Sequence, residues 1–269
     1  MSDLIVRPSA PDAEGSVLKI TPESAGWTYV GFEVCRLSSG QSLARATGEM
    51  EVCLVLLSGK VHAEANGREW TDVGRRMDVF EQIPPYAVYV PQHSSYRLTA
   101  ITDAEIAVCS APGKEGYEAR LITPEQVGVE ARGYGNMSRT IHNILPEQEP
   151  AGSLLVVEVF TPGGHWSSYP PHKHDQDLLP HESYLEETYY HRINPARGFA
   201  MQRVYTDDRS LDEALVVRDG EAVLVPRGYH PVAAAPGYDS YYLNVMAGPV
   251  RTWKFHNDPD HEWLFRKPD

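Results

Sequence analysis

Short runs of β-branched and aromatic residues, separated by turn residues, dominate the hydrophobic pattern of the chain. Few windows place apolar residues at the i, i+3, i+4 and i+7 spacing of an amphipathic helix. The 21 Pro and 21 Gly interrupt the sequence at short intervals. Many short strands bounded by turns are typical of an all-β sandwich or barrel. The predicted strands include Thr28–Val34, Val52–Leu57, Ala87–Val90, Glu105–Val108, Leu154–Phe160, Ala222–Val225 and Tyr241–Val245.

An internal repeat underlies these strands. Glu51 lies at the start of one predicted strand, and the segment Val90-Pro91-Gln92-His93 lies at the end of a later one. His93 follows Glu51 by 42 positions. In the second half Glu187 opens a strand and Val225-Pro226-Arg227-Gly228-Tyr229-His230 closes another, 43 positions from Glu187 to His230. We therefore predict two β-domains, at residues 1–110 and 151–269. Residues 111–150, rich in Gly, Pro and charge, form the connecting segment.

Composition excludes several classes of function. The chain has 24 Lys+Arg against 37 Asp+Glu, a net charge of −13, and no basic cluster that would neutralise nucleic-acid phosphates. It has no apolar run long enough for a transmembrane helix, and its start does not resemble a secretory signal. Cys35, Cys53 and Cys109 are widely spaced and are expected to be buried and reduced, as in a cytoplasmic protein. Nucleotide-binding and serine-hydrolase motifs are absent.

The histidines cluster in the second half, where eight of the 11 follow residue 160. His172 and His174 stand two apart, so on a strand they point to one face while Lys173 points away. Glu187 from the next strand and His230 from a later one would complete a set of three His and one carboxylate. These ligands suit Zn, Mn, Fe or Ni better than Ca or Mg.

The ordered series H-x-H, then Glu before an aromatic strand, then P-x-G-x-H resembles the two motifs of the cupin superfamily. The insertion before the Glu is longer than usual, which leaves Glu186 and Glu187 both open; strand phase with Tyr189 and His191 favours Glu187. The resemblance implies a bicupin, two cupin-type β-barrel (jelly-roll) domains in tandem. Glu51 and His93 take the equivalent positions in the first domain, but it lacks an H-x-H, so we expect no metal site there.

Longer sequence segments make the family resemblance more specific. The segments Trp166–Asp175, Leu185–Arg192, Gln202–Asp207, Val225–Pro231 and Tyr241–Pro249 are similar to the 5-deoxy-glucuronate isomerase family of bacterial myo-inositol catabolism. Trp27–Phe32 and Gly74–Arg76 extend the similarity to the first half. The family implies a ketol isomerisation of 5-deoxy-D-glucuronate to 5-dehydro-2-deoxy-D-gluconate. Such a reaction moves a hydrogen between neighbouring carbons and needs no redox cofactor.

Four protein ligands on a six-coordinate metal leave two positions for the α-hydroxy carbonyl of a substrate, with the metal as Lewis acid and template. His191 and Tyr189 share a face with Glu187 and are the candidate acid–base residues, although both could equally line the barrel. Arg203 and the adjacent Gln202 are the candidate substrate-binding residues, and Arg203 could bind the substrate carboxylate or form a surface ion pair. Asp175 or Asp207 could orient a ligand histidine.

Two other functions fit the same ligands. One is a cupin dioxygenase that uses Fe(II), and the other is a non-enzymatic bicupin that binds a metal and a sugar. The ligand types leave the metal open, and the residue types leave open whether the hydrogen moves through an enediolate or as a hydride. The predicted partner is a small uronic acid, and the bicupin plan is compatible with a homo-oligomer.

Overall fold

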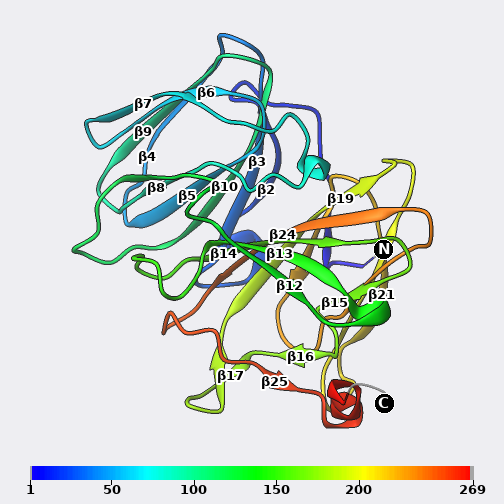
Figure 1. Ribbon diagram of the computed structural model, residues 1–269. Helices are drawn as coiled ribbons and strands as arrows, with labels where there is room; N and C mark the ends of the chain where they lie inside the picture. Colours follow the sequence, from blue (N-terminus) through cyan, green and yellow to red (C-terminus); the bar gives the residue numbers. More distant parts are fainter. Residues whose placement is uncertain (1, 267–269) are drawn as a thin grey trace. The chain divides into compact units, whose positions relative to one another are not determined.

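The computed structural model describes residues 2–266, and its regular structure is almost entirely β-strand (Figure 1). Every strand predicted above is present, some with shifted ends, which confirms the all-β fold. In this described part of the chain the α-helix is α1 (Pro22–Ala25), and the 3-10 helices are η1 (Val79–Glu81), η2 (Gly135–Met137) and η3 (Pro259–Phe265). Within residues 2–266, every helix falls short of the length and apolarity needed to cross a bilayer.

The strands are β1 (Ile5–Val6), β2 (Ser16–Ile20), β3 (Gly31–Leu37), β4 (Ser42–Ala46), β5 (Met50–Ser58), β6 (Val61–Ala65), β7 (Arg68–Val73), β8 (Ala87–Val90), β9 (Ser95–Ala100), β10 (Ala104–Pro112), β11 (Arg120–Ile122), β12 (Gly128–Arg132), β13 (Arg139–Leu145), β14 (Leu155–Thr161), β15 (Trp166–Ser167), β16 (His172–Lys173), β17 (Asp175–Leu178), β18 (Glu182–Tyr184), β19 (Glu186–Asn194), β20 (Ala200–Tyr205), β21 (Asp212–Val217), β22 (Ala222–Val225), β23 (Val232–Ala234), β24 (Asp239–Ala247) and β25 (His256–Asn257).

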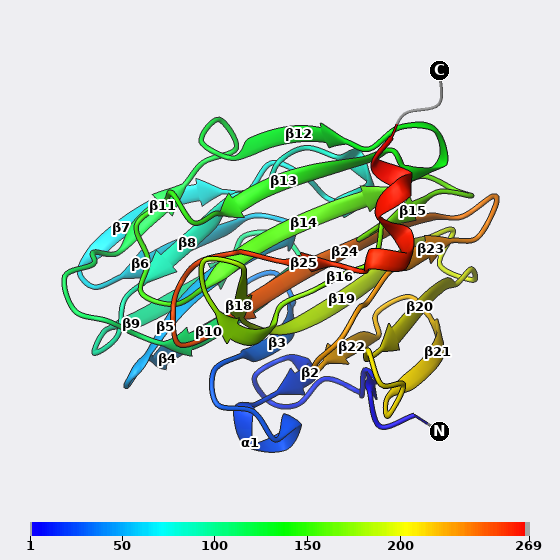
Figure 2. The same cartoon turned by 90° about the horizontal axis from the view of Figure 1, so that it is seen from below.

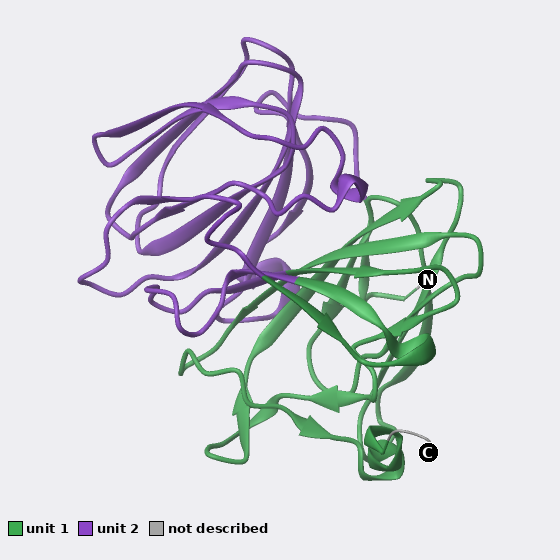
Figure 3. Cartoon of the chain, viewed as in Figure 1, with its two compact units in different colours: residues 1–7, 129–141, 158–269 green, residues 8–128, 142–157 purple. Residues whose placement is uncertain are grey.

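The chain divides into two compact units (Figure 3). Unit 1 comprises residues 1–7, 129–141 and 158–269, and unit 2 comprises residues 8–128 and 142–157. These limits differ from the predicted boundaries at 110 and 150 because the intervening segment contributes to both units. The N-terminus also joins unit 1, where β1 pairs with β22. A strand of two residues has no periodicity that a sequence could reveal.

Unit 2 contains two antiparallel sheets that share one core. Their strand orders are β11-β8-β5-β10-β3-β2 and β4-β9-β6-β7. Buried side chains of both sheets, such as Leu54 and Leu98, belong to one apolar cluster. Cys35, Cys53 and Cys109 are buried and unpaired, as predicted.

Unit 1 repeats this strand order. Its larger sheet contains the strand order β22-β19-β24-β14-β13, which corresponds to β8-β5-β10-β3-β2 in unit 2. Its four-stranded sheet has the order β15-β23-β20-β21. Strands β19 and β24 lie side by side in both views (Figures 1 and 2) and pair along nine residues. The internal repeat predicted from the sequence is therefore present in the sheets.

The position of Glu51 differs from the prediction. Val52, Leu54 and Leu56 enter the core of unit 2, so Glu51 points to the other face of β5. Val52 pairs with Val90 at the end of β8, as Glu187 pairs with Val225 at the end of β22. Val52 is therefore the structural counterpart of Glu187, one residue away from the Glu51 that sequence spacing favoured.

Candidate metal centre

Strand β19 presents Glu187, Tyr189 and His191 on one face because side chains alternate along a strand. The neighbouring strand β24 places Asn244 opposite Tyr189 and Tyr242 opposite His191. Asn244 Nδ2 donates a 2.7 Å hydrogen bond to Glu187 Oε1. One carboxylate oxygen of Glu187 is thereby anchored, which leaves Oε2 to face the histidines.

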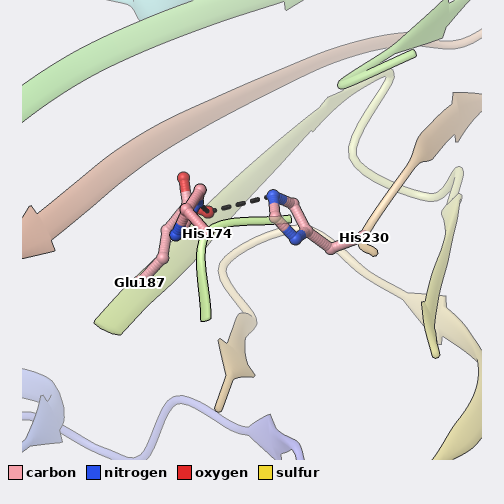
Figure 4. A group of neighbouring side chains, drawn as sticks. All are labelled: His174, Glu187 and His230. Atoms are coloured by element: carbon pink, nitrogen blue, oxygen red, sulfur yellow. Dashed lines mark hydrogen bonds and ion pairs between the residues drawn. The ribbon is translucent and has the colours of Figure 1, made fainter. Parts of the chain in front are cut away.

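Two histidines converge on that oxygen (Figure 4). His174 Nε2 and His230 Nε2 each lie 3.1 Å from Glu187 Oε2. The opposite ring nitrogens meet backbone carbonyls: His174 Nδ1 is 3.1 Å from Leu185 O, and His230 Nδ1 is 2.9 Å from Gly228 O. These carbonyls require Nδ1 to carry a hydrogen, and they orient each ring with Nε2 toward Glu187, the arrangement typical of metal-binding histidines.

These three residues are the group within residues 2–266 whose ligand atoms all lie close enough to share a metal ion. All three side chains are buried, and both imidazole Nε2 atoms contact the same carboxylate oxygen. The two imidazoles and one carboxylate fit a borderline divalent ion.

Electrostatics favour a charged carboxylate at this point. Burial alone would raise the pKa of Glu187, but the neighbouring His230 and His174 hold it well below its ordinary value. Burial opposes the charged form of His174, and its hydrogen bond and attraction to Glu187 outweigh that opposition, so its pKa is raised. An ionised carboxylate is the form that binds a cation.

His172, the fourth predicted ligand, lies beside this group. Its ring packs edge-on against His230, with 5.1 Å between the ring centroids, and also lies 4.7 Å from Phe255. Burial and the neighbouring His230 and His174 lower the pKa of His172 well below its usual value. A neutral imidazole is again the form that binds a metal.

The turn that carries His230 depends on glycine. Gly228 has a φ of +86°, and a Cβ at this position would lie 2.3 Å from Tyr205 O. The Gly228 amide donates a 2.8 Å hydrogen bond to Asp175 Oδ2. The Asp175 carboxylate therefore holds the backbone of the turn that carries His230. It orients this histidine indirectly, through the backbone amide of Gly228.

Lys173 points away from its neighbouring histidines, as strand alternation predicts. It is buried, and its Nζ lies 3.1 Å from Asp175 Oδ1 and 2.9 Å from Asp207 Oδ2. Asp207 also accepts a hydrogen bond from the Tyr229 hydroxyl. Asp207 thus contacts Lys173 and Tyr229 and not a ligand histidine.

The two candidate acid–base residues are buried in unit 1 with different partners. His191 Nε2 lies 2.9 Å from Gln202 Oε1, and His191 Nδ1 has no hydrogen-bond partner within residues 2–266. The Tyr189 hydroxyl lies 3.0 Å from Ser168 Oγ, and its ring packs 5.6 Å from that of His230. Burial lowers the pKa of His191 to about 4 and raises that of Tyr189 well above its usual value.

Gln202 and Arg203 separate to opposite faces of β20. Gln202 is buried against His191, whereas Arg203 is exposed and forms a bidentate pair with Asp212, both contacts at 2.8 Å. The Arg203 guanidinium also lies over the Tyr205 ring. The structure therefore brings Gln202, and not Arg203, to the residues around the candidate metal ligands.

Three neighbours of the site escaped the sequence prediction: Asn244, Ser168 and Tyr242. Asn244 is a buried amide within an apolar strand, and that isolated polar position was a usable signal. Ser168, at a φ of +47°, approaches both tyrosines, with its Oγ 3.3 Å from the Tyr242 hydroxyl. No pattern in the sequence marks that contact.

The fold and this cluster define the class: an all-β protein of the cupin type with a candidate metal centre in one of its two units. Residues 4–264 match the model of the KduI/IolB family. The chain belongs to the KduI/IolB family.

Individual relatives cover nearly the whole chain. A curated 5-deoxy-glucuronate isomerase of Geobacillus kaustophilus (strain HTA426) is 66% identical over 264 residues, 98% of this chain and 96% of the relative. That of Bacillus subtilis (strain 168) is 47% identical, covering 99% and 100%. The crystal structure of an IolB-like protein from Salmonella typhimurium LT2 has a TM-score of 0.96 at 50% identity, covering 98% and 100%. A Lactobacillus farciminis oxalate decarboxylase shares the fold alone, with a TM-score of 0.65 at 10% identity and coverage of 100% and 91%.

Proposed function

We propose that this protein is a metal-dependent ketol isomerase that converts 5-deoxy-D-glucuronate to 5-dehydro-2-deoxy-D-gluconate in inositol catabolism. The observation that carries the proposal is the 66% identity, over 98% of the chain, to a curated 5-deoxy-glucuronate isomerase. The grouping of two imidazoles around one ionised carboxylate supports it independently. The three buried thiols are consistent with a cytoplasmic enzyme.

His174, Glu187 and His230, with His172 beside them, would hold one divalent ion such as Zn, Mn, Fe or Ni. When bound, the ion supplies a Lewis acid that polarises the carbonyl oxygen and orients the neighbouring hydroxyl. Asn244 fixes the carboxylate, and the carbonyls of Leu185 and Gly228 fix the two rings. Such support holds ligand geometry and raises ligand basicity.

His191 is suited to move the proton. With Gln202 Oε1 as acceptor, Nε2 carries the ring hydrogen and Nδ1 presents a buried lone pair. Its pKa of about 4 keeps the ring neutral near pH 7 and therefore able to accept a proton. In the proposed step His191 Nδ1 removes the C2 hydrogen as a proton and returns it to C1. The hydroxyl hydrogen passes from O2 to O1, so the aldehyde becomes an alcohol and C2 becomes a ketone.

Tyr189 is suited to donate a hydrogen bond to the substrate. Its strongly raised pKa keeps the phenol protonated, so it donates a hydrogen bond and does not act as a base. Ser168 orients the hydroxyl on one side, and the Tyr242 ring, 4.9 Å away, supports the Tyr189 ring. We assign Tyr189 to donate a hydrogen bond to a substrate oxygen on which negative charge develops.

The experiment combines an isomerase assay on 5-deoxyglucuronate with elemental analysis of the same sample. We expect turnover without uptake of oxygen, loss of activity after chelation, and recovery when one divalent metal is restored. His174→Ala should remove metal and activity, and His181→Ala, an exposed histidine of the same segment, serves as the matched control. Oxygen consumption coupled to substrate loss would identify a dioxygenase, and tight sugar binding without turnover a sensor; either result would contradict the proposal.

A further inference from the structure

The proposed substrate carries a carboxylate at the end of the molecule remote from the reacting carbons, and this negative charge needs a cation in unit 1. The net charge of −13 makes a local cation more important, because the overall field repels an anion. Arg203 is exposed on the outer face of β20 and is already neutralised by Asp212. The cation must therefore come from another element.

Arg139 begins β13, which lies two strands from β24 in the order β24-β14-β13. Its Nη1 donates a 3.0 Å hydrogen bond to Met137 O, and a Cβ on Gly133 would lie 2.8 Å from that same nitrogen. The guanidinium is therefore held beneath the loop of residues 133–138, which contains η2. Because a hydrogen bond fixes the side chain and a close backbone covers it, Arg139 has a defined position.

That loop contacts the segment that leads to Ser168, a neighbour of the tyrosines of the candidate site. Helix η2 contacts β15, and His165 Nδ1 lies 3.0 Å from Ser138 O. Directly after β15 comes Ser168, whose Oγ lies 3.0 Å from the Tyr189 hydroxyl and 3.3 Å from the Tyr242 hydroxyl. The elements that hold Arg139 are thus continuous with the side of the site that Tyr189 and Tyr242 form.

The Arg139 guanidinium has no direct carboxylate partner in the part of the chain that the structure describes. The side chain is half-buried, and burial lowers its pKa; the neighbouring Arg132 also lowers this pKa, whereas Tyr242, Glu130 and Tyr189 raise it. No carboxylate within residues 2–266 lies at ion-pair distance from it, whereas nearby Arg132 is paired with Glu130 at 2.9 Å. A desolvated guanidinium without a carboxylate is costly for the fold, and it is complementary to a carboxylate supplied by a ligand.

We propose that Arg139 binds the carboxylate of the uronate substrate, on the Tyr242 side of the site and remote from the reacting carbons. The assignment rests on the proposed isomerase function for the identity of the substrate. Arg139 selects for acidic sugars and orients the chain of the sugar, and it does not touch the atoms that exchange hydrogen. Its loss should weaken substrate binding more than it slows turnover.

The test compares Arg139→Gln with Arg203→Gln, which removes an equal charge from the exposed face. With 5-deoxyglucuronate, Arg139→Gln should raise KM at least tenfold with a smaller effect on kcat, and Arg203→Gln should leave both within about twofold. The preference for 5-deoxyglucuronate over 5-deoxyglucose, its neutral counterpart, should disappear in Arg139→Gln alone. Arg139→Lys, which keeps the charge and loses the fork, should fall between the wild type and Arg139→Gln.

Calorimetric titration with D-glucuronate and with D-glucose separates this inference from the proposed function. The wild type should bind glucuronate more tightly than glucose whether or not it turns over 5-deoxyglucuronate, and Arg139→Gln should lose that difference while its metal content stays unchanged. Absence of isomerase activity in the wild type would overturn the proposed function. Retention of the preference for the acid in Arg139→Gln, or its loss in Arg203→Gln, would overturn the role of Arg139.

Discussion

Replacing Glu51 by Gln should strongly destabilise unit 2, because the Glu51 carboxylate is fully buried and receives four hydrogen bonds. Oε1 accepts from the amides of Ser153 and Leu154 at 2.6 and 2.7 Å. Oε2 accepts from the Gly152 amide at 2.7 Å and the Tyr89 hydroxyl at 2.6 Å. The side chain is 0% exposed, so no water can replace a lost partner.

The magnitude follows from these contacts. Gln keeps one oxygen, and its NH2 group would face two donors, so at least two hydrogen bonds to a charged acceptor disappear. At about 1.5–3 kcal/mol for each such bond, Glu51→Gln should lower the free energy of unfolding by about 3–6 kcal/mol. Tyr89→Phe removes one donor and should cost about half as much or less.

The assay is urea unfolding followed by tryptophan fluorescence at pH 7. Glu49→Gln, an exposed residue two positions away, is the matched control and should change the free energy of unfolding by no more than about 0.5 kcal/mol. A loss below about 1 kcal/mol in Glu51→Gln would refute the reasoning, because it would mean that the buried amides do not need the carboxylate. If Glu51→Gln does not fold, the unfolding free energies of Tyr89→Phe and Glu49→Gln are compared instead. Tyr89→Phe should then show the larger loss, although a smaller one than expected for Glu51→Gln.

Three further predictions concern unit 1. Asn244→Ala frees Glu187 Oε1 and should weaken metal affinity by about 10–100-fold in a chelator competition, with unfolding in urea as the control for stability. Gly228→Ala must place a side chain at a φ of +86° against Tyr205 O, so we expect at least about 1 kcal/mol of destabilisation and lower metal content. Because the pKa of His191 falls from 6.5 unfolded to about 4 folded, the unfolded chain binds more protons between these values and stability declines as the pH falls through this window. Chelated wild type should therefore lose about 2 kcal/mol more than His191→Gln between pH 7 and pH 5, and equal losses would contradict the buried neutral imidazole.

Within unit 1, the sequence was most informative where chemistry and periodicity agreed. Glu187, Tyr189 and His191 alternate along a strand of nine residues, and their common face is what two-residue periodicity predicts. The same rule placed Lys173 away from its neighbouring histidines, where the structure pairs it with Asp175. These positions needed only local geometry.

Contacts between segments that are distant in the sequence could not be predicted from local periodicity. Asn244 reaches Glu187 across 57 positions because β24 pairs with β19, and no single segment records that pairing. Arg139 stands in the segment predicted to connect the domains, and only the sheet order brings it near β24. Gln202 and Arg203 were both candidates because the sequence showed adjacent polar residues, while the phase of β20 depends on its pairing with β21 and β23.

The two units use equivalent strands in the same phase, and the Glu51 discrepancy is an offset of one residue in the equivalence expected from the sequence. The run Val52–Leu57 in β5 is apolar at every position, so alternation cannot show which residues face the core. A shift of one residue exchanges every inward side chain for an outward one. Val52 therefore occupies the position of Glu187, and the Glu51 carboxylate lies on the opposite face, where it binds the backbone at 152–154. A metal site in unit 2 would consequently need an acid at Val52 and new histidines opposite it, and a change at Glu51 would alter stability without creating or removing a ligand.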